Sequence, residues 1–440
     1  MIAPAVEWRK VPWAADGWYL SSRPSFITDP AWHAGLYYVQ EASSMFLEQV
    51  FSQHVADRGA LRVLDACAAP GGKSTHLQAL IGSGGLLVSN EVIRTRVPIL
   101  AENLQRWGAD NTIVTQNDPR DFAGLPGFFD VLMVDAPCSG SGLFRREPEA
   151  IGEWSPSLVQ LCSQRQERIL SDLWGSLKEG GVLIYSTCSY SVEEDEQILD
   201  WLSRSFAVES LRVGIDEQWG VVEVQGGAYG YRFYPNRLAG EGFFIAAFRK
   251  KGDSPAAVGH GGSSSFGSSS SHGGPSSFGS TSGHGSHRAG PRQRRPGGEP
   301  LGKGIAEGLT PWLQNPERYH LFQTGEMIRA LPIGFSEDLA RLSAVLNVRE
   351  AGVTLGEWMR NGLVPEQGLA MSRLLSQDIP RVELTRDEAL AYVRKDELRL
   401  EGLPQGWALV TYGGYGLGWV KVLAGRINNY YPKHWRVLKR

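Results

Sequence analysis

Two cysteines in this chain lie in short polar motifs that could carry covalent chemistry. Cys138 lies in DAPCSG and Cys188 in STCSY, and each motif directly follows an apolar run with strand character. Loops at strand ends carry function more often than packing, whereas an isolated cysteine is usually a small buried hydrophobe. We interpret Cys67 and Cys162 as small buried hydrophobic residues of this kind. A thiol in a strand-end loop could instead act as a nucleophile.

One reaction that requires a thiol is methylation of a cytosine at C5. C5 is a poor nucleophile, but a thiolate that adds to C6 makes C5 enamine-like and able to attack an activated methyl group. A second thiol could assist release, and an acid such as Asp135 could bond the N3/N4 edge of the base. The base would have to leave its stack to reach such a site. The residues alone leave open which of Cys138 and Cys188 is the nucleophile.

A glycine-rich turn, LDACAAPGGKST at 64–75, follows the first expected strand. Such a turn lets the backbone approach a ligand and opens a helix whose N-terminus faces that ligand. It is not a phosphate-binding P-loop, because Cys67 stands where that motif needs glycine. Glu91, Asp118 and Asp135 follow the next three strands, and parallel strands end at one edge of a sheet. Together they favour a cofactor that contains a nucleoside.

Strand-like runs alternate with helical stretches before residue 250, which predicts an α/β fold with a parallel sheet covered on both faces. A further pair of strands, near 231–234 and 242–249, is expected to form a hairpin at the edge. The main expected strands are 62–67, 86–91, 112–116, 130–135 and 182–187, and the main expected helices are 92–107 and 157–177.

The length and composition point to a protein of several domains. The 440 residues suggest two or three domains, and the net charge of -3 requires any RNA-binding surface to be local. No apolar run is long enough to span a bilayer and no secretory signal is visible, so we expect a cytoplasmic protein. The four cysteines lack the spacing of a zinc site, so no metal is expected.

The motifs YYVQEASSM (37–45), DACAAPGGKST, DAPCSGSG and STCS occur in this order and resemble the Sun/nucleolar-protein (NOL/NOP/Sun) family of RNA cytosine-C5 methyltransferases. The resemblance implies the class I methyltransferase fold, a Rossmann-like, doubly wound sheet of seven strands. It implies S-adenosyl-L-methionine as cofactor, Cys188 as the nucleophile and Cys138 as the residue that assists product release. The cofactor contacts that it implies are Cys67, Ala68, Ala69, Pro70, Gly71, Gly72, Lys73, Glu91, Asp118 and Asp135.

Both ends of the chain are similar to the RsmF-like branch of that family, which methylates small-subunit ribosomal RNA. The similar segments are 23–48 and 418–438, the latter at the end of a PUA-like domain. The organisation expected is a remnant of an N-terminal RNA-binding region with a lead-in helix (1–50), the methyltransferase domain (51–250), a disordered Gly/Ser-rich linker (251–300), a first C-terminal RNA-binding module (301–376) and a small α+β or β-rich PUA-like domain (377–440).

The C-terminal segment is basic and aromatic, and it has two interpretations. Its cations could hold an RNA backbone while Tyr430, Tyr431 and Trp435 stack on unpaired bases. Alternatively, it is a solvated basic tail on a packed aromatic core. Its cations are Lys421, Arg426, Lys433, Arg436, Lys439 and Arg440.

The partner expected is ribosomal RNA or the small ribosomal subunit, with no membrane and a monomeric protein. Two alternatives remain. The same chemistry could act on transfer RNA, since the motifs describe the base and cofactor rather than the surrounding RNA. The chain could also be a non-catalytic assembly factor that binds ribosomal RNA, although retention of both Cys138 and Cys188 argues against that alternative.

Overall fold

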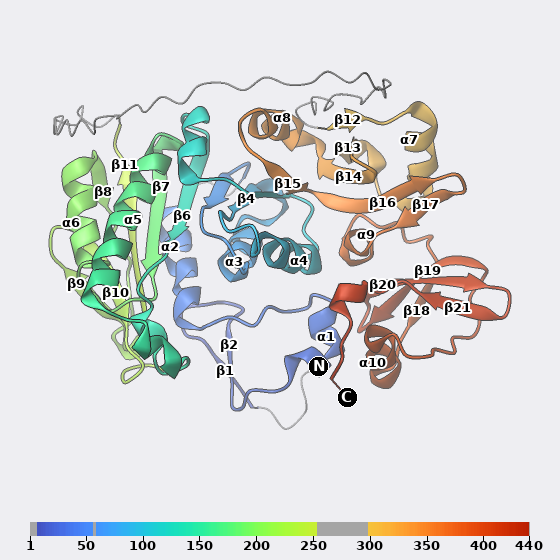
Figure 1. Cartoon of the computed structure of the whole chain (residues 1–440), viewed down its shortest axis with the longest axis horizontal. Helices are drawn as coiled ribbons and strands as arrows, with labels where there is room; N and C mark the ends of the chain where they lie inside the picture. Colours follow the sequence, from blue (N-terminus) through green and yellow to red (C-terminus); the bar gives the residue numbers. More distant parts are fainter. Residues whose placement is uncertain (1–6, 56–58, 253–297, 440) are drawn as a thin grey trace, which may run out of the picture.

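The computed structural model describes residues 7–55, 59–252 and 298–439, and a central sheet of ten strands organises them (Figure 1). The strand order is β15-β5-β4-β3-β6-β7-β11-β10-β9, with β8 paired to β11. The five strands from β5 to β7 run parallel, and β11 is antiparallel to β7. The bounds are β3 Arg62–Asp65, β4 Leu86–Asn90, β5 Thr112–Thr115, β6 Phe129–Asp135, β7 Leu177–Thr187, β8 Val208–Ser210, β9 Val222–Gln225, β10 Tyr229–Phe233, β11 Phe243–Lys250 and β15 Val348–Ala351.

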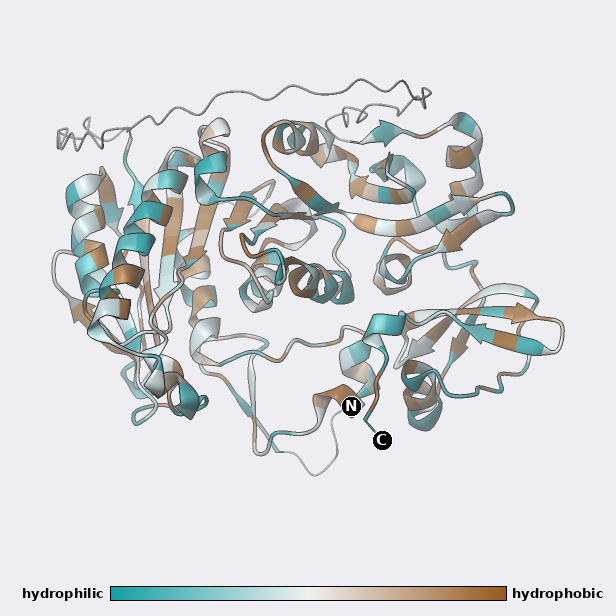
Figure 2. Cartoon of the chain, viewed as in Figure 1, coloured by the Kyte–Doolittle hydropathy of each residue, from teal (hydrophilic) through white to brown (hydrophobic). Residues whose placement is uncertain are grey.

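The parallel strands are apolar on both faces because helices cover both faces. Along β3, Val63 belongs to one core and Leu64 to the other. Figure 2 shows apolar residues continuing through the strands of this sheet. The core containing Val63 is closed by α2 Leu47–His54 and α3 Gly72–Ile81, beside α4 Val97–Trp107. The opposite core is closed by α5 Pro156–Trp174, α6 Glu196–Ser205, η4 Pro119–Gly124 and α8 Ser336–Val345.

The doubly wound α/β sheet predicted from the sequence is confirmed, and so is the hairpin of β10 with β11. The expected helix 92–107 begins only at Val97, because residues 92–96 form a loop after β4. The seven strands implied by the resemblance are those from β5 to β10 in the order of the sheet. The structure adds β8, β9 and β15 to them. The most distant addition is β15, which comes from beyond the linker and pairs antiparallel with β5. An unpaired edge strand can accept such a partner through its backbone groups.

Two smaller sheets follow residue 298. The first has the order β12-β13-β14-β16-β17 and packs with α7 Lys303–Leu309 and α9 Gln367–Met371. The second has the order β18-β19-β20-β21 and packs with α10 Arg386–Arg394. Their bounds are β12 Glu299–Pro300, β13 Tyr319–Thr324, β14 Met327–Pro332, β16 Val353–Met359, β17 Gly362–Pro365, β18 Arg381–Glu383, β19 Gly406–Tyr412, β20 Tyr415–Leu423 and β21 Arg426–Asn429. Most of the predicted linker, 253–297, lies outside the described residues, and its last two positions form β12.

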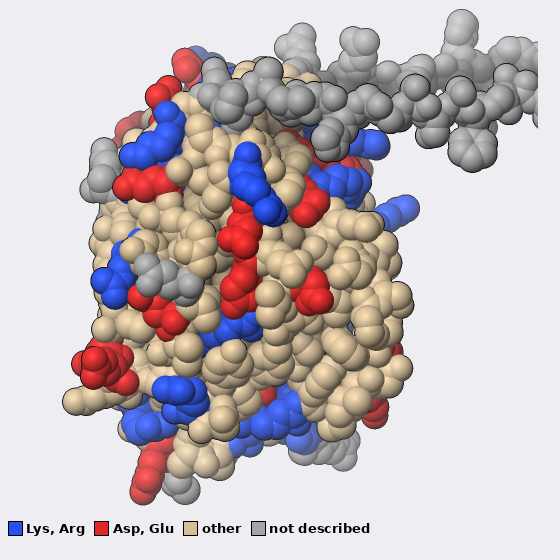
Figure 3. Space-filling view, turned by 90° about the vertical axis from the view of Figure 1, so that its left-hand side faces the viewer, with Lys and Arg blue, Asp and Glu red and all other residues tan. Residues whose placement is uncertain are grey.

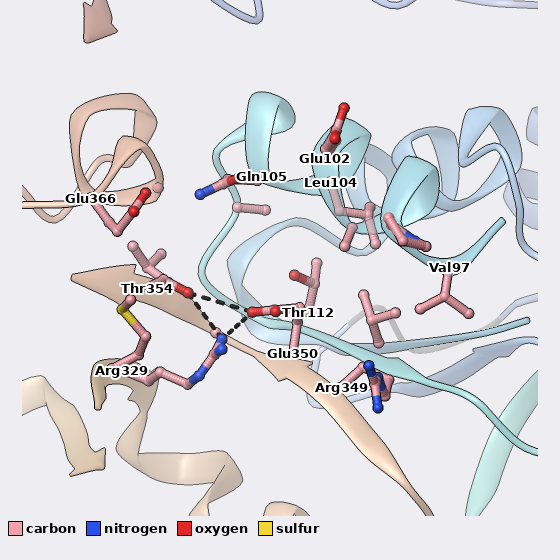
Figure 4. A pocket seen from close by; sticks show the side chains of 18 of the residues that line it. Val97, Glu102, Leu104, Gln105, Thr112, Arg329, Arg349, Glu350, Thr354 and Glu366 are labelled. Carbon is pink, nitrogen blue, oxygen red and sulfur yellow. Dashed lines mark hydrogen bonds and ion pairs between the residues drawn. The ribbon is translucent and has the colours of Figure 1, made fainter. Parts of the chain in front are cut away.

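A pocket marks the junction between the unit built on the central sheet and the first C-terminal sheet (Figure 4). On its floor, Arg329 of β14 forms an ion pair with Glu350 of β15 and donates to Thr354 Oγ1 of β16 at 2.9 Å. Because β15 also extends the central sheet, the contacts of Arg329 with Glu350 and Thr354 connect the first C-terminal sheet to the central sheet.

The N-terminal segment also contacts the C-terminal sheet. This segment holds a small hairpin, β1 Trp8–Lys10 with β2 Trp18–Leu20, and α1 Pro30–His33. His33 Nδ1 lies 2.9 Å from the Tyr431 hydroxyl. The Arg106 guanidinium of α4 lies between the rings of Trp32 and Trp435, 4.3 and 4.5 Å from their centroids. The two ends of the chain therefore meet against α4.

Charged side chains of both signs are interspersed on the face that carries α6 and β9 (Figure 3), in keeping with the small net charge. Among the described residues, the structure contains no helix that is both long and apolar enough to cross a bilayer.

Candidate active site

The two motif cysteines meet at the carboxyl edge of the central sheet. Asp135 at the end of β6 pairs in register with Ser186 of β7, so the loops after these strands lie side by side. Their thiols are 3.2 Å apart, Cys138 Sγ to Cys188 Sγ. This hydrogen bond, together with burial, raises the pKa of the Cys138 thiol well above its usual value.

A buried carboxylate that the motif analysis did not single out connects the two cysteine loops. Glu194 accepts from Ser139 N at 2.8 Å and from the hydroxyl of Ser139, and it accepts from the Ser189 hydroxyl at 2.6 Å. Ser139 directly follows Cys138, and Ser189 directly follows Cys188. Gln166 of α5 donates to the same carboxylate at 3.2 Å. One buried side chain therefore fixes the backbone on both sides of the thiol pair.

A second buried acid holds the other side of Cys188. Thr187 donates its hydroxyl to Asp195 at 2.6 Å, and Asp195 lies 3.1 Å from the Arg232 guanidinium. Both carboxylates come from the acidic run 193–196, EEDE. A run of acids normally indicates a solvated face, and only the fold shows that Glu194 and Asp195 are fully buried.

Asp135 bonds a cation and a hydroxyl beside the cysteines. Its carboxylate accepts from Lys73 Nζ at 2.7 Å and from Ser186 Oγ at 2.7 Å. Burial alone would lower the pKa of Lys73, but the ion pair with Asp135 raises it above its usual value. About a third of the Asp135 side chain remains exposed, so its oxygens stay accessible to a bound base.

The glycine-rich turn forms a cradle at the start of α3. Residues 67–71 form the loop after β3, and Gly72 and Lys73 open the helix. Gly71 has φ +117, a backbone conformation that favours glycine. The loop is held in place by the Ala68 amide, which donates to Asn90 O at 2.8 Å. The N-terminus of α3 thus faces the same edge of the sheet as the cysteines.

The residues around the cradle fit a nucleoside-containing cofactor. Glu91, only 2% exposed, directly follows β4, with one oxygen accepting from Ile93 N and the other 3.2 Å from Arg96. A carboxylate at this place can accept from ribose hydroxyls. Val92 and Ile93, which follow it, are about half exposed and offer an apolar surface to a planar base. The motif analysis missed these two residues, because nothing in their types distinguishes them from core residues.

Asp118 lies farther along the same edge, as the N-cap of η4. It accepts from Arg120 N at 3.2 Å, and its side chain is about a quarter exposed. Asp65, at the end of β3 beneath the cradle, was not predicted as a site residue. It accepts from Ser74 Oγ at 2.7 Å, and burial raises the pKa of its carboxyl to about 7.

The structure decides between the two interpretations of the C-terminal aromatics. Tyr431 and Trp435 are buried in the core of the last sheet, whereas Tyr430 is 40% exposed. The packed-core interpretation therefore holds for Tyr431 and Trp435, and only Tyr430 is available to a partner. Arg440 lies outside the described residues.

Comparison with known proteins agrees with this geometry. Residues 54–249 match the family model described as 16S rRNA methyltransferase RsmB/F, residues 379–437 match the methyltransferase RsmF PUA domain, and residues 1–42 match the N-terminal domain of 16S rRNA methyltransferase RsmF.

Individual relatives extend this match. Ribosomal RNA small subunit methyltransferase F of Pectobacterium atrosepticum is 35% identical over 251 residues, which span 56% of this chain and 51% of that protein. The protein of the same name from Vibrio campbellii is 28% identical over 98% of this chain and 87% of its own length. Among solved structures, PH0851 superposes with a TM-score of 0.51 and 27% identity over 56% of this chain and 54% of that one.

A doubly wound sheet with a glycine-rich turn after its first strand, matched by a methyltransferase model over that region, defines a methyltransferase that uses S-adenosylmethionine. All three models match in chain order, so the chain is similar to 16S rRNA methyltransferase RsmF from its N-terminal segment to its last sheet.

Proposed function

We propose that this protein methylates C5 of a cytosine in small-subunit (16S) ribosomal RNA through a covalent adduct between Cys188 and C6 of the base. The observation that carries the proposal is the contact of two thiols, 3.2 Å apart, at the sheet edge that also holds the cofactor cradle. Methylation at C5 needs one thiol to activate the ring and benefits from a second group to resolve the adduct. Similarity to 16S rRNA methyltransferases supports the ribosomal RNA substrate.

The two thiols have different roles in this proposal. In this proposal Cys138 donates a hydrogen bond to the sulfur of Cys188, and Cys188 acts as the nucleophile. The Cys188 thiolate forms a bond to C6, and the electron pair of the C5–C6 double bond moves to C5. When the proton on C5 later leaves to a base, the double bond re-forms and the bond from C6 to sulfur breaks. Cys138 assists this last step.

Asp135 orients the base in this scheme. Its carboxylate can accept from the exocyclic amine of cytosine, while Lys73 and Ser186 hold it in place. Residues 67–73 with Glu91 and Asp118 would hold S-adenosylmethionine, which would supply the methyl group to C5 as the bond from that group to the sulfonium sulfur breaks. The target cytosine must be unstacked to reach this edge of the sheet. A cytoplasmic location and a monomeric state stay predictions.

The test is methyl transfer from labelled S-adenosylmethionine to three substrates in parallel: small-subunit particles, naked ribosomal RNA and bulk transfer RNA. We expect label on ribosomal RNA, at a cytosine that bisulfite sequencing then identifies. Cys188→Ala should abolish the transfer while cofactor affinity stays nearly unchanged, because Cys188 contacts the base rather than the cofactor.

The alternatives give different outcomes. Label on transfer RNA alone would retain the chemistry and contradict the substrate. A Cys188→Ala protein that loses cofactor binding would contradict the nucleophile assignment. No label on any RNA, with cofactor bound, would favour a non-catalytic role in subunit assembly.

A further inference from the structure

A second cavity lies next to the cysteine pair and is not used by the proposed reaction. Its volume is about 710 Å³, within the range of sites that hold small organic ligands. Four segments build its walls: the β1–β2 hairpin, the stretch from Ser21 to Met45, the segment that contains Arg145 and the segment that contains Glu241. It has aromatic, basic and polar walls.

The cavity shares walls with the active site. On one side, Tyr38 and Gln40 lie over the cofactor cradle, because a Cβ placed on Gly72 would lie 3.1 Å from the Tyr38 ring. On the other side, Glu241 precedes Gly242, whose amide donates to Gly142 O at 3.0 Å. The amide of Gly142 in turn donates to Cys188 O at 2.8 Å. Only these two glycines separate the cavity wall from the backbone of the proposed nucleophile.

The hairpin presents aromatic rings to this cavity. Trp8 and Trp18 are 48% and 43% exposed, and their rings meet edge to face with centroids 6.2 Å apart. Large aromatic side chains on a surface are suited to stacking against unpaired bases. Lys10 Nζ lies 4.3 Å from the Trp18 centroid, so positive charge accompanies the rings.

Two of the three acids that line the cavity, Glu41 and Glu241, are engaged by the protein, whereas Asp16 is exposed. Glu241 receives two hydrogen bonds from Arg145, at 3.1 and 2.9 Å. Glu41 accepts from the backbone amides of Ser44 and Glu241. The wall also contains the exposed guanidinium groups of Arg23 and Arg146. Basic groups beside exposed aromatic rings match a segment of single-stranded nucleic acid.

We propose that this cavity receives an unpaired nucleotide that neighbours the target cytosine, with its base on the Trp8–Trp18 wall and its phosphate toward Arg23 and Arg146. This inference rests on the proposed function. When the target base leaves its stack, the neighbouring base loses a stacking partner. A second aromatic surface replaces that partner by stacking on the base. The cavity therefore lowers the cost of extruding the target.

The test uses the full chain and an RNA oligonucleotide that spans the mapped cytosine. The target is replaced by 5-fluorocytosine, whose fluorine prevents the final loss from C5 and so preserves the adduct with Cys188. The neighbouring position, on the 5′ side or the 3′ side, carries the fluorescent base 2-aminopurine. We expect its fluorescence to be quenched in the complex on one side only, and the quenching to be lost in Trp18→Leu.

Kinetics on the unmodified oligonucleotide provide the second measurement. Trp18→Leu and Arg23→Gln should each raise KM about tenfold with little change in kcat, as the loss of one stacked base or one phosphate contact predicts. Trp18→Phe, which retains a ring, should restore most of the affinity. Arg204→Gln is the matched control, because Arg204 is an exposed arginine on α6, outside this cavity. Melting temperature and cofactor affinity should be the same in all of these variants.

The outcomes separate the two proposals. Adduct formation with equal fluorescence and KM in wild type and Trp18→Leu would overturn the cavity assignment and leave the proposed function intact. No adduct, combined with quenching that depends on Trp18, would overturn the proposed chemistry while the cavity still binds the nucleotide. Equal or tighter binding of the same sequence as a duplex would also contradict the assignment, because a paired base cannot enter the cavity.

Discussion

The sulfur atoms of Cys138 and Cys188 lie 3.2 Å apart although fifty residues separate them along the chain. They meet because β6 and β7 are parallel neighbours, so the two loops leave the sheet at the same edge. The hydrogen bond with Cys188 and burial raise the pKa of the Cys138 thiol well above its usual value.

The first prediction follows from this contact. Cys138→Ala should form the adduct with RNA normally but resolve it slowly, with turnover reduced about 100-fold, the scale of one acid–base group. The adduct should appear as a slow-migrating species on a denaturing gel. Cys138→Ala combined with Cys188→Ala should show no such species. A single variant that releases product at the wild-type rate would exclude a role for Cys138 in resolution.

A second prediction concerns Glu194, which connects the loops of both thiols through Ser139 and Ser189. Glu194→Gln removes the charge and one acceptor, and should lower the free energy of unfolding by about 1–3 kcal/mol. It should also lower kcat about 10–100-fold, because small displacements of reacting groups are costly. Cofactor affinity should not change.

Glu193→Gln is the matched control, since Glu193 is the adjacent acid and only partly buried. Its kcat and unfolding free energy should equal those of the wild type. If both variants lost activity to the same degree, the effect would belong to the acidic run as a whole and not to the hydrogen bonds of Glu194.

A third prediction concerns pH and Asp65. Burial raises the pKa of its carboxyl in the folded protein to about 7, above the value of about 4 expected for the unfolded chain. The folded state therefore holds the proton more tightly, and the stability that this contributes is lost as pH rises from about 4 through 7. The full effect of such a shift is about 4 kcal/mol.

Asp65→Asn should remove this pH dependence, because the amide does not titrate. Urea unfolding at pH 5 and pH 8 measures the effect: the variant should gain stability relative to wild type at pH 8. If the difference in unfolding free energy between the two proteins were the same at pH 5 and at pH 8, the raised pKa of Asp65 would be contradicted. Ser74→Ala removes a hydrogen bond to the ionised carboxylate. The unfolding free energy of this variant should therefore depend on pH more steeply than that of the wild type.

The fourth prediction tests the contact between the two ends of the chain. Arg106 lies between Trp32 of the N-terminal segment and Trp435 of the last sheet. Two desolvated cation–π contacts contribute about 2–4 kcal/mol together. Arg106→Ala should therefore lower the melting temperature by about 5 °C or more, measured by calorimetry. Arg204→Ala, at an exposed position on α6, should leave it unchanged.

The motifs by themselves determined much of the catalytic unit. Alternation of strands and helices predicted the parallel sheet, because apolar runs of strand length bounded by turns have few other interpretations. Types and spacing were enough to select Cys138, Cys188, Asp135 and the glycine-rich turn, since a strand-end loop brings its residues to one edge of any parallel sheet.

Only the tertiary structure decided how these residues are held. The sequence could not show that Glu194 and Asp195 are buried while Glu193 is not, because burial of a charge depends on partners distant in the chain. It could not show that β15 extends the sheet beyond β5, since edge pairing uses backbone groups that every residue has. Nor could it place Trp18 and Glu241 in one cavity, because only the packing of the hairpin against the loops at the sheet edge creates that cavity.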